Sequence, residues 1–158
     1  MLYVGVFADD EPVDEVVDAA ALLPEVDFAI TGDLARCPAA LRNRAPANVE
    51  FVGFLGPDAY AAEFGRAHAI MSLTTEPTSI MRSAYEAVYA RRPLVTSEWP
   101  SLQQVFPLAH HAANVAPALA DAVRTALQDD AARLDKALAL QSARWFDQLT
   151  RLQAALSR

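Results

Sequence analysis

Residues 73–97, LTTEPTSIMRSAYEAVYARRPLVTS, alternate between apolar and polar segments in a pattern that indicates a strand, a loop, a helix, a turn and a second strand. The loop carries hydroxyl side chains on both sides of Pro77, directly before the predicted helix. The first backbone N–H groups of a helix have no partner within the helix, and the helix dipole favours a negative charge beside them. The loop is therefore a candidate site for a phosphate group.

Four polar residues of the predicted helix, Ser79, Arg82, Ser83 and Glu86, recur at helical spacing and share one face, opposite a stripe of apolar residues. A carboxylate such as that of Glu86 can accept two hydrogen bonds from the two hydroxyls of a ribose. Two interpretations are open from this segment alone. One is a nucleotide site, and the other is a capped amphipathic helix whose polar face lies in solvent.

Short apolar runs alternate with helical patterns along the whole chain, which is typical of a parallel sheet wrapped by helices. We predict an α/β fold with a doubly wound, Rossmann-like sheet of about six strands in the order 3-2-1-4-5-6 and helices on both faces. No linker or repeat interrupts the pattern, so residues 1–158 are predicted to form a single domain that ends in a long helix over 129–158. The predicted strands cover residues 2–8, 26–31, 49–53, 69–73, 94–96 and 112–115.

The composition limits the kinds of function. The 158 residues are 53% hydrophobic and carry a formal net charge of −7, which makes nucleic acid a poor partner. No apolar run approaches the roughly 20 residues of a membrane span, and the N-terminus lacks a signal-peptide pattern. The single cysteine, Cys37, permits no internal disulfide. We therefore expect a cytoplasmic protein without a transmembrane segment.

The first predicted strand is followed by three acids, Asp9, Asp10 and Glu11, and then by Pro12 at the start of a predicted helix. No histidine or regular spacing supports a metal site there, and acids at a helix start favour the helix dipole. No Gly-x-Gly-x-x-Gly motif follows this strand, which argues against a dinucleotide dehydrogenase.

Several short motifs occur in a fixed order, and together they resemble the carboxyl-terminal half of two-domain GT-B glycosyltransferases of the retaining family-4 type (glycosyl transferases group 1). The motifs are NVEFVGFL at 48–55, Tyr60, AHAI at 67–70, YEA at 85–87 and RPLVTS at 92–97. In that family this half of the enzyme binds the nucleotide-sugar donor. The resemblance thus implies a nucleotide diphosphate sugar as donor substrate, without a metal or another cofactor.

The resemblance also implies roles for individual residues. Glu86 would accept the ribose hydroxyls, and the loop formed by Gly53, Phe54 and Leu55 would lie near the base. The amides and hydroxyls around Thr75, Thr78 and Ser79 would contact the diphosphate. Arg82 is either a further diphosphate ligand on the same stripe or an arginine in solvent.

The sequence departs from the family pattern at three places. The usual motif has two glutamates separated by seven residues, but Thr78 stands at the first position and Glu76 lies two residues too early. Glu76 and Thr78 are both candidates for the first-glutamate position, so the catalytic residue is left open. The family's diphosphate-neutralising arginine and lysine have no clear counterpart near the first strand. The amino-terminal, acceptor-binding half is absent, so we expect the isolated chain to be inactive or nearly so.

Two functions follow from these features. The first is the donor-binding domain of a retaining glycosyltransferase, which transfers a glycosyl group to an unknown acceptor when joined to an acceptor-binding half or a partner chain. The second is a non-catalytic partner or scaffold that kept the fold and lost the catalytic glutamate pair. A third possibility is an unrelated doubly wound binding domain, whose small ligand would still lie at the carboxyl ends of the strands. In the final helix, Trp145 and Phe146 either are partly exposed and favour self-association or pack within the domain.

Overall fold

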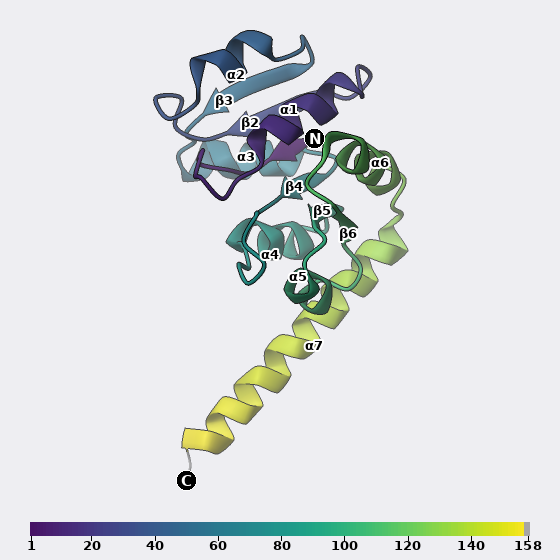
Figure 1. Cartoon of the computed structure of the whole chain (residues 1–158). Coiled ribbons are helices and arrows are strands. Elements are labelled where there is room, and N and C mark those ends of the chain that lie inside the picture. Colours follow the sequence, from purple (N-terminus) through teal and green to yellow (C-terminus); the bar gives the residue numbers. More distant parts are fainter. Residues whose placement is uncertain (157–158) are drawn as a thin grey trace.

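The computed structural model, which describes residues 1–156, contains one six-stranded, all-parallel sheet in the order β3-β2-β1-β4-β5-β6 (Figure 1). This result confirms the predicted strand order. The order reverses between β1 and β4, which lie side by side. The carboxyl ends of such strands are where open α/β folds bind ligands. The strands are β1 (Leu2–Tyr3), β2 (Phe28–Thr31), β3 (Val49–Gly53), β4 (Ile70–Ser72), β5 (Leu94–Ser97) and β6 (His110–Ala112).

Helices cover both faces of the sheet and bury a separate apolar core on each face. The strands are short apolar runs because both of their faces are covered. Each fully buried aliphatic side chain contributes about 1.5–3 kcal/mol relative to an exposed one. One face carries α1 (Val13–Ala21), α2 (Ala39–Arg44) and α6 (Ala116–Ala126). The other carries α3 (Pro57–Arg66), α4 (Arg82–Tyr89), α5 (Pro100–Val105) and the first part of α7 (Ala131–Leu156).

Strand β1 ends at Tyr3, earlier than the predicted strand over residues 2–8. Beyond it, the hydroxyl of Thr31 accepts a hydrogen bond from the Gly5 N–H and donates one to the Gly5 carbonyl, both at 3.0 Å. These side-chain bonds take the place of regular ladder bonds between β1 and β2. Phe7 then adopts a left-handed conformation with φ +59°, which breaks any extended strand.

Helix α7 begins at Ala131 and continues to Leu156, close to the predicted range of 129–158, whose last two residues lie outside the described part of the chain. The helix packs on α4 and then extends away from the sheet (Figure 1). Trp145 and Phe146 are 53% and 67% exposed, so the alternative in which they pack within the domain is wrong. Within residues 1–156, no helix combines the length and hydropathy needed to cross a bilayer.

Candidate functional site

A groove of about 530 Å³ lies at the carboxyl ends of β1, β2 and β4, where the strand order reverses. Its walls come from the loops that follow β1, β2 and β3, and from the start of α3 and α4. Four of the residues predicted from the sequence, Phe54, Leu55, Arg82 and Glu86, line this groove. The structure therefore brings together residues that are up to 32 positions apart in the chain, from the predicted base loop and the predicted ribose-binding helix.

The carboxylate of Glu86 is held from two sides. The Tyr60 hydroxyl donates a hydrogen bond of 2.6 Å to Oε2, and the Arg82 Nε forms an ion pair of 2.9 Å with Oε1. Burial, together with this hydrogen bond, raises the pKa of Tyr60, so its hydroxyl stays protonated and can donate. Each carboxylate oxygen has a further acceptor position. Glu86 can therefore accept hydrogen bonds from a diol in the groove while both protein contacts persist.

Helix α4 begins at Arg82, so Ser79 does not lie on the helix, contrary to the prediction. The preceding loop closes on itself, because the Glu76 N–H donates to the Thr74 hydroxyl at 3.0 Å and the Ser79 N–H donates to the Glu76 carbonyl at 3.2 Å. Met81 is extended, with ψ 140°, and separates this turn from the helix. The free N–H groups at the start of the helix are therefore those near Arg82 and Ser83, which both line the groove.

The three hydroxyl residues predicted to contact the diphosphate do not line the groove. Thr75 is exposed and donates a hydrogen bond to the Asp10 carbonyl at 3.2 Å, Thr78 is exposed, and Ser79 lies within the turn. Glu76 and Thr78, the two candidates for the first-glutamate position, are both exposed on the same loop. Gly53 is buried with φ +79° and turns the chain so that Phe54 and Leu55 enter the groove.

Buried hydroxyls fix the start of α4 and the loop before it. Ser83 and Ser72 share a hydrogen bond of 2.6 Å between their side-chain oxygens, which ties α4 to β4. The Thr74 N–H donates a hydrogen bond to the Ser97 hydroxyl at 3.0 Å. The Thr74 carbonyl accepts hydrogen bonds from the side chains of Trp99 and Asn114, both at 2.9 Å. The predictions missed Trp99 and Asn114, because no local pattern relates residues 25 and 40 positions from Thr74.

The charged side chains that line the groove are mainly acidic. Asp10, Glu11 and Glu86 contribute carboxylates to its lining, while Arg82 is the one arginine or lysine among its described lining residues. The Arg82 side chain is 85% exposed, so solvent screens its charge and its pair with Glu86 adds little to stability. The groove therefore suits the neutral sugar and base of a nucleotide better than its phosphates.

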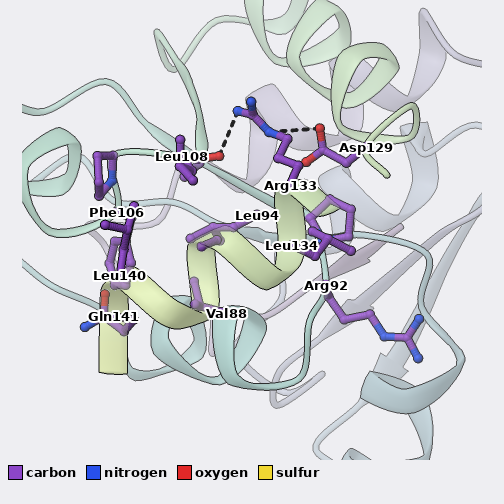
Figure 2. A pocket seen from close by; sticks show the side chains of 14 residues that line it. Val88, Arg92, Leu94, Phe106, Leu108, Asp129, Arg133, Leu134, Leu140 and Gln141 are labelled. Atoms are coloured by element: carbon purple, nitrogen blue, oxygen red, sulfur yellow. Dashed lines mark hydrogen bonds and ion pairs between the residues drawn. The ribbon is translucent and has the colours of Figure 1, made fainter. Parts of the chain in front are cut away.

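A second cavity lies at the opposite edge of the sheet, between α4, α7 and the segments that lead into β5 and β6 (Figure 2). Apolar side chains such as Val88, Leu94, Phe106 and Leu134 line most of it. Its volume is about 20 Å³, which is enough for about one water molecule. This cavity is a packing gap beneath α7 and is too small to hold a nucleotide.

Residues 14–150 match the family model described as glycosyl transferase-like. The match covers most of the chain, so the protein belongs to this family. No curated protein matches the sequence.

Solved structures with similar folds include a glycosyltransferase and trehalose 6-phosphate synthases. One is AviGT4, a glycosyltransferase involved in avilamycin A biosynthesis, with a TM-score of 0.72 and 16% identity over 98% of this chain and 51% of its own. Another is an α,α-trehalose 6-phosphate synthase from Burkholderia multivorans, with a TM-score of 0.71 and 17% identity over 99% of this chain and 43% of its own. A third is described as trehalose-6-phosphate from Escherichia coli bound with UDP-2-fluoro glucose, with a TM-score of 0.72 and 13% identity over 90% of this chain and 40% of its own.

At these identities the similarity establishes the fold, which is that of one half of a GT-B glycosyltransferase. The chain spans about half of the length of these proteins or less.

Proposed function

We propose that this domain binds the nucleotide part of a nucleotide diphosphate sugar in the groove at the carboxyl edge of the sheet. The observation that carries the proposal is the position of Glu86, which lines the groove with both oxygens oriented by Tyr60 and Arg82. A carboxylate held in this way is preorganised to accept the two ribose hydroxyls. Phe54, which is 78% exposed at the rim of the same groove, offers an aromatic face to the base.

In this proposal the reaction of the complete enzyme is glycosyl transfer to an acceptor, with retention of the anomeric configuration. The acceptor-binding half belongs to the remainder of a longer chain or to a partner chain. The N–H groups at the start of α4 stabilise the leaving diphosphate electrostatically, a contribution that is often the largest in such reactions. The proposed reaction uses the nucleotide diphosphate sugar as donor substrate and involves no cofactor.

Titration calorimetry of the isolated domain with UDP, GDP and ADP tests the proposal. We expect one of the three nucleotides to bind with a dissociation constant below about 1 mM, corresponding to at least about 4 kcal/mol. Binding of none of them at millimolar concentration would contradict the donor-site proposal.

A specific observation favours the second candidate function, a non-catalytic partner or scaffold domain. The residue at the first-glutamate position is Thr78, and Glu76 lies on an exposed loop outside the groove. The acidic lining also opposes a diphosphate. A scaffold of this kind would bind none of the three nucleotides and would still pair with an acceptor-binding half.

The exposed aromatic face of α7 is proposed to contact another protein surface. In the isolated domain we expect Trp145 and Phe146 to drive self-association, because exposed aromatic side chains on a projecting helix are costly to leave in water. Light scattering should then give a mass above that of a monomer, and the Trp145→Ser variant should return to monomer mass. An unchanged mass in this variant would remove the self-association proposal.

A further inference from the structure

The loop after β1 wraps around the carboxylate of a residue from its own chain, Glu11. Glu11 Oε2 accepts hydrogen bonds from the N–H groups of Val6 at 2.9 Å, Phe7 at 2.8 Å and Ala8 at 3.3 Å, and Oε1 accepts one from Val6 at 3.0 Å. The left-handed conformation of Phe7 lets these successive N–H groups converge. Such a concavity of backbone amides is a nest that binds anions. The loop is therefore an anion cradle whose occupant is Glu11.

The space beside Gly5 allows the carboxylate of Glu11 to approach the backbone closely. A Cβ atom at Gly5 would lie 2.7 Å from Glu11 Oε2 and 2.5 Å from the ring of Tyr3, so glycine is required for this close approach. Tyr3 is fully buried, and its hydroxyl has no hydrogen-bond partner in the described part of the chain. Burial raises the pKa of Tyr3, and the nearby carboxylate of Glu11 adds to this effect. A buried, unused hydrogen-bond donor thus lies beside the cradle.

The cradle opens directly onto the groove that contains Glu86. Gly5, Val6 and Glu11 line that groove together with Arg82 and Glu86, because β1 and β4 are neighbours in the sheet. A nucleotide whose ribose contacts Glu86 would bring its phosphates to this edge of the sheet. There it would meet backbone N–H groups that are already engaged and a negative charge at their centre.

We infer that Glu11 is a specificity-determining residue that excludes phosphoryl groups from the cradle of the β1 loop. Its carboxylate is tethered to the cradle by a few residues, so its effective concentration there is high and a free phosphate competes poorly. The diphosphate of a bound nucleotide is thereby confined to the start of α4. The role of Glu11 in nucleotide binding rests on the proposed function, but the cradle itself can be tested with a simple anion.

Titration calorimetry with pyrophosphate, UDP and uridine, applied to the wild type and to the Glu11→Ala and Glu11→Gln variants, tests this inference. Both variants remove the negative charge, and Gln keeps a carbonyl that can accept hydrogen bonds from the loop. We expect pyrophosphate and UDP to bind both variants at least about tenfold more tightly than the wild type, and uridine to bind all three equally. In Glu11→Ala, the amide hydrogens of Val6, Phe7 and Ala8 should exchange faster and be protected again by pyrophosphate.

The matched control is Glu15→Ala, which removes a carboxylate from the first turn of α1, four residues further along the chain, and Glu15 does not line the groove. This control should bind pyrophosphate as weakly as the wild type. Equal pyrophosphate affinity in the wild type and both Glu11 variants would overturn the inference, and so would an equal gain in the control. If Glu11→Ala does not fold, the Gln variant decides the outcome alone. A failure of the proposed nucleotide site would give a different result. Pyrophosphate would still bind the Glu11 variants more tightly than the wild type, but UDP would bind these variants no more tightly than pyrophosphate does.

Discussion

Replacement of Glu86 by Gln is expected to weaken nucleotide binding by about 100-fold. The substitution keeps the size of the side chain but removes the negative charge that strengthens the two hydrogen bonds from the ribose, each worth about 1.5–3 kcal/mol when one partner is charged. The substitution also replaces one acceptor oxygen by an NH2 group, which cannot accept a hydrogen bond from a ribose hydroxyl or from the Tyr60 hydroxyl. Calorimetry with the nucleotide that binds the wild type most tightly measures the effect.

The control for this substitution is Glu50→Gln, on the exposed surface of β3 and outside the groove. It should leave the dissociation constant unchanged within about twofold, because a surface charge at such a distance is screened by salt. Thermal unfolding of both variants shows whether the fold is retained. A Glu86→Gln variant that folds normally and binds the nucleotide as tightly as the wild type does would contradict the role assigned to Glu86.

Replacement of Asp129 by Ala is expected to lower the free energy of unfolding by about 3 kcal/mol, because removal of this buried carboxylate leaves the polar groups that it contacts uncompensated. Asp129 Oδ2 lies 2.9 Å from His110 Nε2, and Oδ1 lies 3.0 Å from Arg133 Nε. The side chains of Asp129 and His110 are only 8% and 9% exposed. These contacts join β6 to the start of α7, near the small cavity of Figure 2. Urea unfolding monitored by tryptophan fluorescence gives the difference.

Asp121→Ala serves as the comparison for Asp129→Ala. Asp121 forms an ion pair of 2.9 Å with Arg124 on α6, but the two side chains are 78% and 47% exposed. Removal of this surface pair should change the free energy of unfolding by less than about 1 kcal/mol. Equal losses in the two variants would show that burial does not strengthen the Asp129 contacts.

The strand order was predictable because each strand is a short apolar run and each crossover is a helix. These are local patterns, and the handedness of βαβ units leaves few arrangements for them. The position of Glu86 was predictable for a similar reason. Its spacing from Arg82 and Ser83 places the three residues together at the start of α4, where all three line the groove.

The start of α4 was predicted too early because the hydroxyls of the loop make hydrogen bonds that compete with the helix. The Thr74 side chain accepts the Glu76 N–H, and the Ser79 N–H is bonded in the following turn. The resulting shift excludes Thr75, Thr78 and Ser79 from the groove. Hydrogen bonds from the side chains of Trp99 and Asn114 to the Thr74 carbonyl also hold the loop in this conformation, and these distant residues are not part of the local pattern.

The environment of Glu11 was not predictable from its sequence neighbours. An acid before a proline at a helix start is the expected pattern for a favourable interaction with the helix dipole. The carboxylate instead turns back onto the N–H groups of Val6 and Phe7, which depends on the left-handed Phe7 and on the space beside Gly5. A left-handed conformation at a bulky aromatic residue has no reliable signature in the sequence.

A crystal structure of the domain with a bound nucleoside diphosphate is the most direct test of the groove as a donor site. We predict that the two ribose hydroxyls lie within 3.2 Å of the Glu86 carboxylate oxygens, the usual range for such hydrogen bonds (about 2.5–3.0 Å for hydroxyl donors), with the base near Phe54. A nucleotide bound at another edge of the sheet, or a Glu86 carboxylate turned away from the ribose, would contradict the proposal.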